Sequence, residues 1–184
     1  MINKKSIGLP LIFWGFICLM PFTLAAIFPI NICSLIYIAL WVICAIIFAR
    51  LFIVSCQIAT SNQRLIQVGA SLMIISYLIR ALNLALQVRT FGSMDMWNGM
   101  SITSILFGWL GLVILFYNLK MGLTGVVFML SGLTMTIPYF LSSLGSMGVI
   151  KWDTYSLLVP VSSLVYLIGF IVSIILCIRW IKKG

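Results

Sequence analysis

Six apolar stretches, each about as long as a membrane is thick, dominate this sequence. Polar residues divide the chain into stretches at about 7–28, 32–54, 65–88, 102–119, 123–144 and 155–178. A helix that crosses a hydrocarbon core of roughly 30 Å needs about 20 apolar residues, and within the membrane its backbone must satisfy its own hydrogen bonds. The pattern therefore predicts an all-α integral membrane protein, folded over residues 1–184 as a single polytopic domain, a compact bundle of about six transmembrane helices.

The composition excludes a water-soluble fold. Apolar residues make up 64% of the chain and charged residues 7%, whereas an ordinary soluble domain is about 45–50% apolar and about 25% charged. So few charges cannot cover the surface of a soluble domain of this size. A soluble enzyme and a disordered chain are therefore excluded. We expect no nucleic-acid partner either, because no basic segment stands apart from the apolar stretches.

The basic residues lie mostly on one side of the six stretches. Short loops rich in lysine and arginine stay in the cytoplasm. If the N-terminus is cytoplasmic, the outer loops carry only Arg89 and Lys151, together with Asp95 and Asp153. Both termini are therefore predicted to be cytoplasmic. The basic residues of the inner side, which we also expect to attract anionic lipid headgroups, are Lys4, Lys5, Arg50, Arg64, Lys120, Arg179, Lys182 and Lys183.

The first stretch has the charged start of a secretory signal, in Lys4 and Lys5. Its apolar run is longer than the 7–15 residues that are usual in such a signal. We expect it to be retained as a helix, because its removal would leave an odd number of spans under the charge pattern. The near absence of soluble loops favours a bacterial inner membrane as the location.

Arg80 is the residue that is most costly to place in a membrane. It lies about 5 Å beyond the centre of the third stretch by helical rise, where an arginine costs about 2.5–3.5 kcal/mol on insertion scales. Ser76, Asn83 and Gln87 share its helical face, so this polar stripe should face the bundle interior or a water-filled cavity. There the guanidinium would hold an anionic group. With the opposite wall from the fifth stretch, the predicted ligand-binding residues are Arg80, Ser76, Asn83, Gln87, Thr136 and Tyr139.

Two structural roles for Arg80 compete with ligand binding. Arg80 could pair with Asp95 or Asp153, the only acidic side chains, both of which are predicted on the same outer side. Its long side chain could also extend to the outer lipid headgroups. Either role would make Arg80 part of the architecture.

Small and hydroxylated residues recur at helical spacing in the last three stretches. Such faces are typical of close helix packing, although they could also line a solute path. Together with the polar stripe around Arg80, these faces predict that the third, fifth and sixth stretches supply a polar interior. The residues concerned are Ser104, Gly108, Gly111, Gly125, Gly132, Thr136, Tyr139, Ser143, Ser162, Tyr166, Gly169 and Ser173.

No pattern in the chain indicates catalysis. Histidine is absent and only two residues are acidic, and neither a phosphate-binding loop nor a nucleophile-elbow motif is present. We therefore expect no enzymatic activity, no metal and no cofactor. The cysteines lie singly and are predicted to be small buried apolar residues; they are Cys18, Cys33, Cys44, Cys56 and Cys177.

The sequence favours a non-enzymatic membrane protein that binds or passes a small solute or lipid, alone or as a transporter subunit. The alternative is an interaction protein without a solute site, such as an assembly or secretion-complex subunit or an immunity factor. Its partners would be other membrane-protein subunits or a second copy. The first interpretation predicts that Arg80 faces an internal cavity. The alternative predicts a filled core and small-residue faces turned outward.

Overall fold

The computed structural model describes residues 4–27, 30–57, 62–89, 92–149 and 152–182, with the side chains of 21–27, 30–32, 152–157 and 159 left aside. Within these ranges the chain is entirely helical. The helices are α1 (Lys4–Ile27), α2 (Ile30–Cys56), α3 (Gln63–Val88), α4 (Met94–Leu119), α5 (Leu123–Ser146) and α6 (Trp152–Lys182). Over the described residues, α2 to α6 are each long and apolar enough to cross a membrane. The protein is thus an integral membrane helical bundle.

The start of α4 differs from the sequence prediction. Residues 94–99 were expected to belong to an outer loop, but the helix begins at Met94. The Ser93 side chain accepts a hydrogen bond from the backbone N–H of Met96 at 3.3 Å, which satisfies a donor that a helix start leaves unpaired. Asp95 in the first turn adds a negative charge where the helix dipole favours one. The loop prediction is therefore wrong from Met94 onward.

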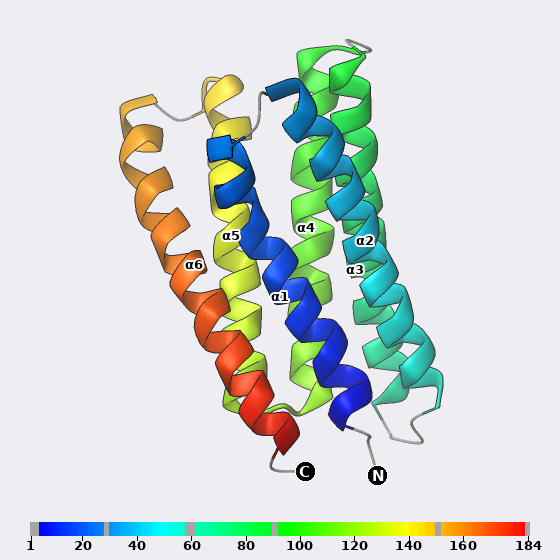
Figure 1. Cartoon of the computed structure of the whole chain (residues 1–184). Coiled ribbons are helices and arrows are strands. Elements are labelled where there is room, and N and C mark those ends of the chain that lie inside the picture. The colour runs from blue at the N-terminus through cyan, green and yellow to red at the C-terminus, as the bar shows by residue number, and fades with distance from the viewer. Residues whose placement is uncertain (1–3, 28–29, 58–61, 90–91, 150–151, 183–184) are drawn as a thin grey trace.

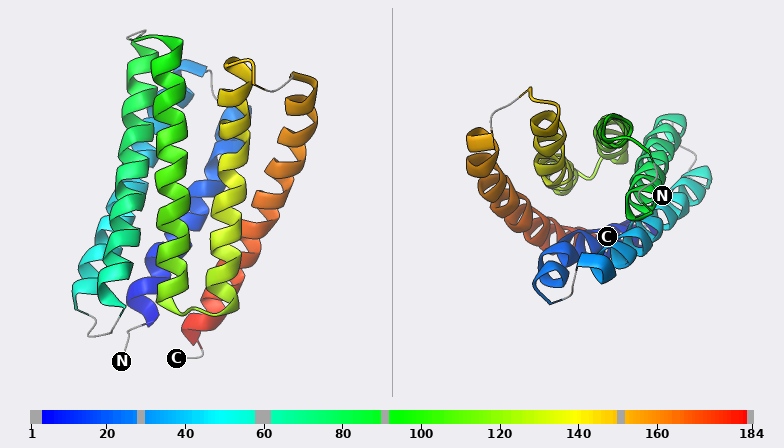
Figure 2. Two further views of the ribbon diagram at one scale, coloured as in Figure 1. Left: turned by 180° about the vertical axis from the view of Figure 1, so that it is seen from behind. Right: turned by 90° about the horizontal axis from the view of Figure 1, so that it is seen from above.

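The helices form a closed ring. Each helix packs against the next along the chain, and α1 also packs against α6 (Figures 1 and 2). The two ends of the chain consequently lie at the same end of the bundle (Figure 1). We call this the terminal end, and the opposite one the far end.

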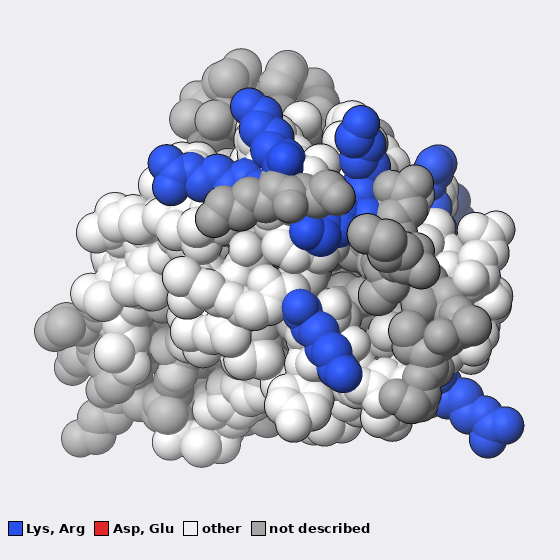
Figure 3. All heavy atoms as spheres, turned by 90° about the horizontal axis from the view of Figure 1, so that it is seen from below, with Lys and Arg blue, Asp and Glu red and all other residues white. Residues whose placement is uncertain are grey.

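Basic side chains gather at the terminal end. Figure 3 shows them on this face, with no acidic side chain among the described residues in view. Because successive helices are antiparallel, the starts of α1 and α3 and the ends of α2, α4 and α6 bring them together. The described residues in this set are Lys4, Lys5, Arg50, Arg64, Lys120, Arg179 and Lys182.

The centre of the ring is aromatic, not polar as predicted. The Trp14 side chain is fully buried, and its ring centroid lies between 5.3 and 6.1 Å from those of four phenylalanines. Its indole N–H donates a hydrogen bond of 2.6 Å to the Tyr77 hydroxyl. Each helix contributes one ring to this aromatic cluster, which consists of Trp14, Phe48, Tyr77, Phe116, Phe128 and Phe170.

Several of the predicted small residues lie at contacts between neighbouring helices. A Cβ atom added at Gly69 of α3 would lie 2.7 Å from the backbone nitrogen of Leu115 in α4. Between α5 and α6, the hydroxyl oxygens of Ser131 and Ser173 are 3.4 Å apart. The small-residue faces therefore serve close helix packing, which is the ordinary function of such faces in membranes.

Candidate functional site

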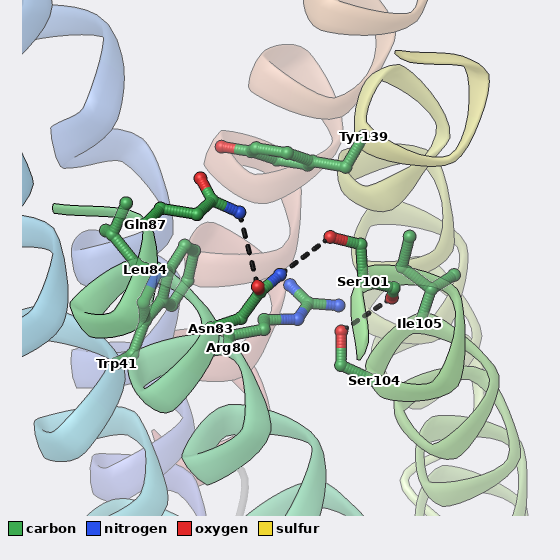
Figure 4. A pocket seen from close by; sticks show the side chains of 9 residues that line it. All are labelled: Trp41, Arg80, Asn83, Leu84, Gln87, Ser101, Ser104, Ile105 and Tyr139. Carbon is green, nitrogen blue, oxygen red and sulfur yellow. Dashed lines mark hydrogen bonds between the residues drawn. The ribbon is translucent and has the colours of Figure 1, made fainter. Parts of the chain in front are cut away.

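A cavity of about 140 Å³ lies among α2, α3, α4 and α5 in the far half of the bundle (Figure 4). Most of its polar side chains come from consecutive turns of α3 and from Ser101 and Ser104 of α4. We call it the Arg80 pocket. Its lining residues are Trp41, Arg80, Asn83, Leu84, Gln87, Ser101, Ser104, Ile105 and Tyr139.

The Arg80 guanidinium rests on two aromatic rings. Its central carbon lies 5.6 Å from the ring centroid of Trp41 and 5.5 Å from that of Tyr77. These two rings stack on each other, with centroids 5.6 Å apart. A cation above an aromatic face is stabilised by the quadrupole of the ring. Trp41 and Tyr77 thus hold the guanidinium in place without neutralising its charge.

Within the described part of the chain, no carboxylate or hydrogen-bond acceptor contacts the Arg80 guanidinium. Asp95 is exposed in the first turn of α4 and makes no ion pair with Arg80, so this predicted pair is wrong. The side chain of Asp153 lies outside the described residues. As far as the described residues are concerned, the N–H donors of Arg80 are therefore available to an occupant of the pocket.

The Arg80 side chain leans toward the middle of the bundle. It reaches back over Tyr77, nearly one turn closer to the start of α3. Side chains on helices point toward the helix N-terminus, which for α3 is the terminal end. The second structural alternative, in which Arg80 extends to lipid headgroups at the far end, is therefore wrong.

Asn83 connects the far end of α3 to α4, and Gln87 supports Asn83 from the next turn of α3. The Asn83 amide donates hydrogen bonds to the backbone carbonyl of Trp97 at 3.1 Å and to the Ser101 hydroxyl at 2.9 Å. Gln87 donates to the Asn83 side-chain oxygen at 3.2 Å. The predicted polar stripe therefore faces the pocket, as Figure 4 shows.

Ser76 and Gly108 shape the space beside Arg80. The Ser76 hydroxyl donates a hydrogen bond of 2.6 Å to the backbone carbonyl of Ser104, so this predicted ligand contact instead joins α3 to α4. A Cβ atom at Gly108 would lie 2.9 Å from the Ser76 hydroxyl oxygen and 3.5 Å from Nη2 of Arg80. The absence of a side chain at Gly108 thus makes room for the guanidinium tip.

The two residues predicted for the opposite wall have different places. Tyr139 lines the pocket, and its ring extends from α5 toward Gln87 (Figure 4). Thr136 does not line it: the side chain is buried, accepts a hydrogen bond from the indole of Trp109 and donates one to the Leu133 carbonyl at 2.8 Å. Thr136 therefore joins α5 to α4 away from Arg80.

The pocket is also lined by residues that were not predicted from the sequence, among them Trp41, Ser101 and Ser104. Tryptophans of membrane proteins are enriched at the two interfaces, but Trp41 lies near the middle of α2. This central position in the helix indicates a role other than anchoring at a membrane interface. Ser101 precedes the predicted fourth span by one residue and becomes part of a helix because α4 begins at Met94.

The pocket is bounded differently at its two ends. Toward the far end, a hollow of about 480 Å³ lined by Ser34 and Val88 shares Leu84 and Gln87 with the pocket. Toward the terminal end lies Tyr77, whose hydroxyl is bonded to Trp14 at the centre of the aromatic cluster. The far end is thus the open side, and the aromatic cluster lies beneath the pocket.

Comparison of the chain with protein-family models, with curated proteins and with solved structures finds no match. Its function is therefore inferred from the chemistry of the Arg80 pocket.

Proposed function

We propose that this protein is a non-enzymatic membrane protein whose Arg80 pocket binds an anionic group, a phosphate or a carboxylate, of a small solute or lipid. The observation that carries the proposal is the Arg80 guanidinium, which lines a cavity and has no acceptor among the described residues. An unneutralised charge in a membrane is costly. A guanidinium fork matches the geometry of carboxylate and phosphate oxygens.

The dimensions of the pocket favour a small anionic group. Its volume of about 140 Å³ is below the roughly 300–1,000 Å³ of sites for drug-sized ligands. A phosphate or carboxylate head therefore fits, while the remainder of a larger ligand would extend through the hollow beside Leu84 and Gln87. The buried aromatic cluster beneath the pocket supports binding rather than passage. A transporter subunit that captures such a ligand is compatible with this geometry.

The proposal includes six membrane spans with both termini in the cytoplasm of a bacterial cell, in the inner membrane. The gathering of the described basic residues at the terminal end supports this orientation (Figure 3), because cytoplasmic loops carry the excess of lysine and arginine. A reporter enzyme fused after Gly184 is expected to lie in the cytoplasm, and its activity should be found there. A fusion that is active outside the cytoplasm would contradict the orientation and the outer position of the Arg80 pocket.

Anion binding at Arg80 is expected to stabilise the folded protein. At a ligand concentration about 100 times Kd, binding adds about 2.7 kcal/mol, which corresponds to a rise in Tm of on the order of 5–10 °C for a chain of this length. The measurement is Tm of the purified protein in detergent with inorganic phosphate, with acetate, and with phosphatidylglycerol against phosphatidylcholine. A rise with free phosphate or acetate identifies a soluble ligand, and a rise with phosphatidylglycerol alone that Arg80→Gln lowers identifies a lipid.

Three variants connect this shift to the pocket. Arg80→Gln is expected to abolish the shift caused by phosphate or acetate and to reduce the shift caused by phosphatidylglycerol, and Gly108→Val to reduce both, because the new side chain occupies the space beside Nη2. Arg64→Gln makes the same charge change on the exposed start of α3 and should retain the shift. The proposal is wrong if none of the anions raises Tm of the unmodified protein, or if Arg80→Gln retains the full shift.

The filled centre of the bundle is the observation that favours the alternative, an interaction protein without a solute site. The small-residue faces do not favour it, because Gly69, Gly111 and Gly169 are covered by neighbouring helices of the same chain. We therefore place anion binding first. A partner that binds equally well to the Arg80→Gln variant would support the alternative.

A further inference from the structure

A groove of about 430 Å³ runs between α1 and α2 near the terminal end of the bundle. The two helices lie next to each other in the ring (Figure 1). Most of the groove is apolar, whereas its end nearest the termini carries two exposed basic side chains. The side chains that define it are Lys5, Leu9 and Phe13 of α1 and Ile43, Ile46 and Arg50 of α2.

The length of the groove matches one leaflet of a membrane. Helical rise puts Ile17 about 18 Å along α1 from Lys5, and half of a hydrocarbon core of roughly 30 Å is about 15 Å. Because α1 and α2 are antiparallel neighbours, Arg50 lies at the Lys5 end and Ile43 at the Ile17 end. The charged end thus falls at headgroup depth when the apolar part lies in the hydrocarbon.

The groove has exposed walls and a buried floor. Leu9, Phe13 and Ile46 are 50%, 63% and 61% exposed, so they stand at its rim, whereas Pro10 and Ile17 are buried. On its other side α1 is closely packed on α6, where a Cβ at Gly15 would lie 2.9 Å from Ile174. Helix α1 therefore packs closely on its α6 side, and the groove is open on its α2 side.

We propose that this groove binds an anionic phospholipid of the leaflet at the terminal end. One acyl chain lies along the apolar walls, and the phosphate is held between Lys5 and Arg50. Charge complementarity selects this occupant, since both basic groups stand at the depth of the headgroup and the rest of the groove is apolar. A second copy of this chain is a poorer occupant, because in the same orientation it would bring its own basic terminal end against Lys5 and Arg50.

This lipid site is separate from the Arg80 pocket. The two sites share no lining residue and lie toward opposite ends of the bundle. Arg80→Gln is therefore expected to leave lipid binding at the groove unchanged. Failure of one proposal does not entail failure of the other.

Native mass spectrometry of the detergent-solubilised protein tests the lipid site directly. Phosphatidylglycerol and phosphatidylcholine with identical acyl chains are supplied in equal amounts, and the ratio of the two in the protein–lipid complex is measured. Each basic residue near an anionic headgroup strengthens the attraction, so the double variant Lys5→Gln/Arg50→Gln is expected to lower this ratio about 30-fold. The matched control Arg64→Gln/Lys120→Gln removes the same charge from exposed positions of the same face and should lower the ratio clearly less than Lys5→Gln/Arg50→Gln does.

A third variant tests the apolar part of the groove. Ile46→Trp leaves every charge in place and fills the space between the walls, so the amount of bound phosphatidylglycerol should fall severalfold. The proposal is overturned if the unmodified protein binds both lipids equally, or if the control pair lowers the ratio as much as Lys5→Gln/Arg50→Gln. It is also overturned if the protein without bound lipid is a dimer that Ile46→Trp dissociates, because the groove would then hold a second copy.

Discussion

Trp14→Ala is expected to lower the free energy of unfolding by about 3 kcal/mol. Truncation of a core tryptophan costs about 3–5 kcal/mol in soluble proteins. Lipid tails are as apolar as a protein core, so the transfer part of this cost shrinks in a membrane, while the loss of dispersion contacts remains. Trp14 touches rings from four other helices and donates a hydrogen bond to Tyr77 of the remaining one. Its removal therefore leaves a cavity at a point where all six helices meet.

The measurement is thermal unfolding of the purified protein in detergent, in which Tm should fall by on the order of 10 °C. Trp14→Phe keeps an aromatic ring but removes the donor to Tyr77, and should cost less, about 1–2 kcal/mol. Phe16→Ala is the matched control, because this ring on the same helix is 50% exposed. Equal loss for Trp14→Ala and Phe16→Ala would show that the aromatic cluster does not hold the ring of helices together.

Gly69→Ala is expected to destabilise the contact between α3 and α4 by about 2 kcal/mol. The added Cβ would lie 2.7 Å from the backbone nitrogen of Leu115 and 2.9 Å from its Cα. Backbone atoms cannot turn aside as a side chain can, so the helices must separate, and overpacking costs typically about 1–3 kcal/mol. Alanine gains up to about 1 kcal/mol in helix propensity over glycine, which offsets only part of the cost. Gly69→Leu should be more damaging still.

The same substitution at Gly99 provides the control. Gly99 is an exposed residue within α4, and a Cβ there would have no atom within 4 Å. Gly99→Ala should therefore leave Tm unchanged or raise it slightly. Because the Arg80 pocket is built across α3 and α4, Gly69→Ala should also weaken the anion-dependent rise in Tm. A Gly69→Ala protein as stable as Gly99→Ala would contradict the close contact of α3 with α4.

Local properties of the sequence were sufficient to predict the helices. Apolar stretches of membrane length predicted the all-helical bundle, and their ends agree with the observed helices to within a few residues, except at α4. That exception depends on Ser93 and Asp95, whose capping effect outweighs the polarity of residues 94–99. A hydropathy pattern detects apolar character and does not weigh a cap, so it placed the start of the helix too late.

The composition of the pocket could be predicted only in part. Arg80, Asn83 and Gln87 lie on one face of one helix, and helical spacing alone places them together. Contacts between helices depend on how each helix is rotated about its axis, which spacing within one segment does not determine. For this reason the stacking of Arg80 on Trp41 was not foreseen, and Thr136 was assigned to a wall that it does not form.

The central claim is that Arg80 holds an anionic group that the protein itself does not supply. The most direct test is an experimental structure of the protein in a lipid bilayer, with attention to what lies within hydrogen-bonding distance of the Arg80 guanidinium. We expect density for a bound phosphate, carboxylate or lipid headgroup against Nη2, with Trp41 and Tyr77 beneath the guanidinium. The carboxylate of Asp153 in that place, sealing the pocket, would contradict it and make Arg80 part of the architecture.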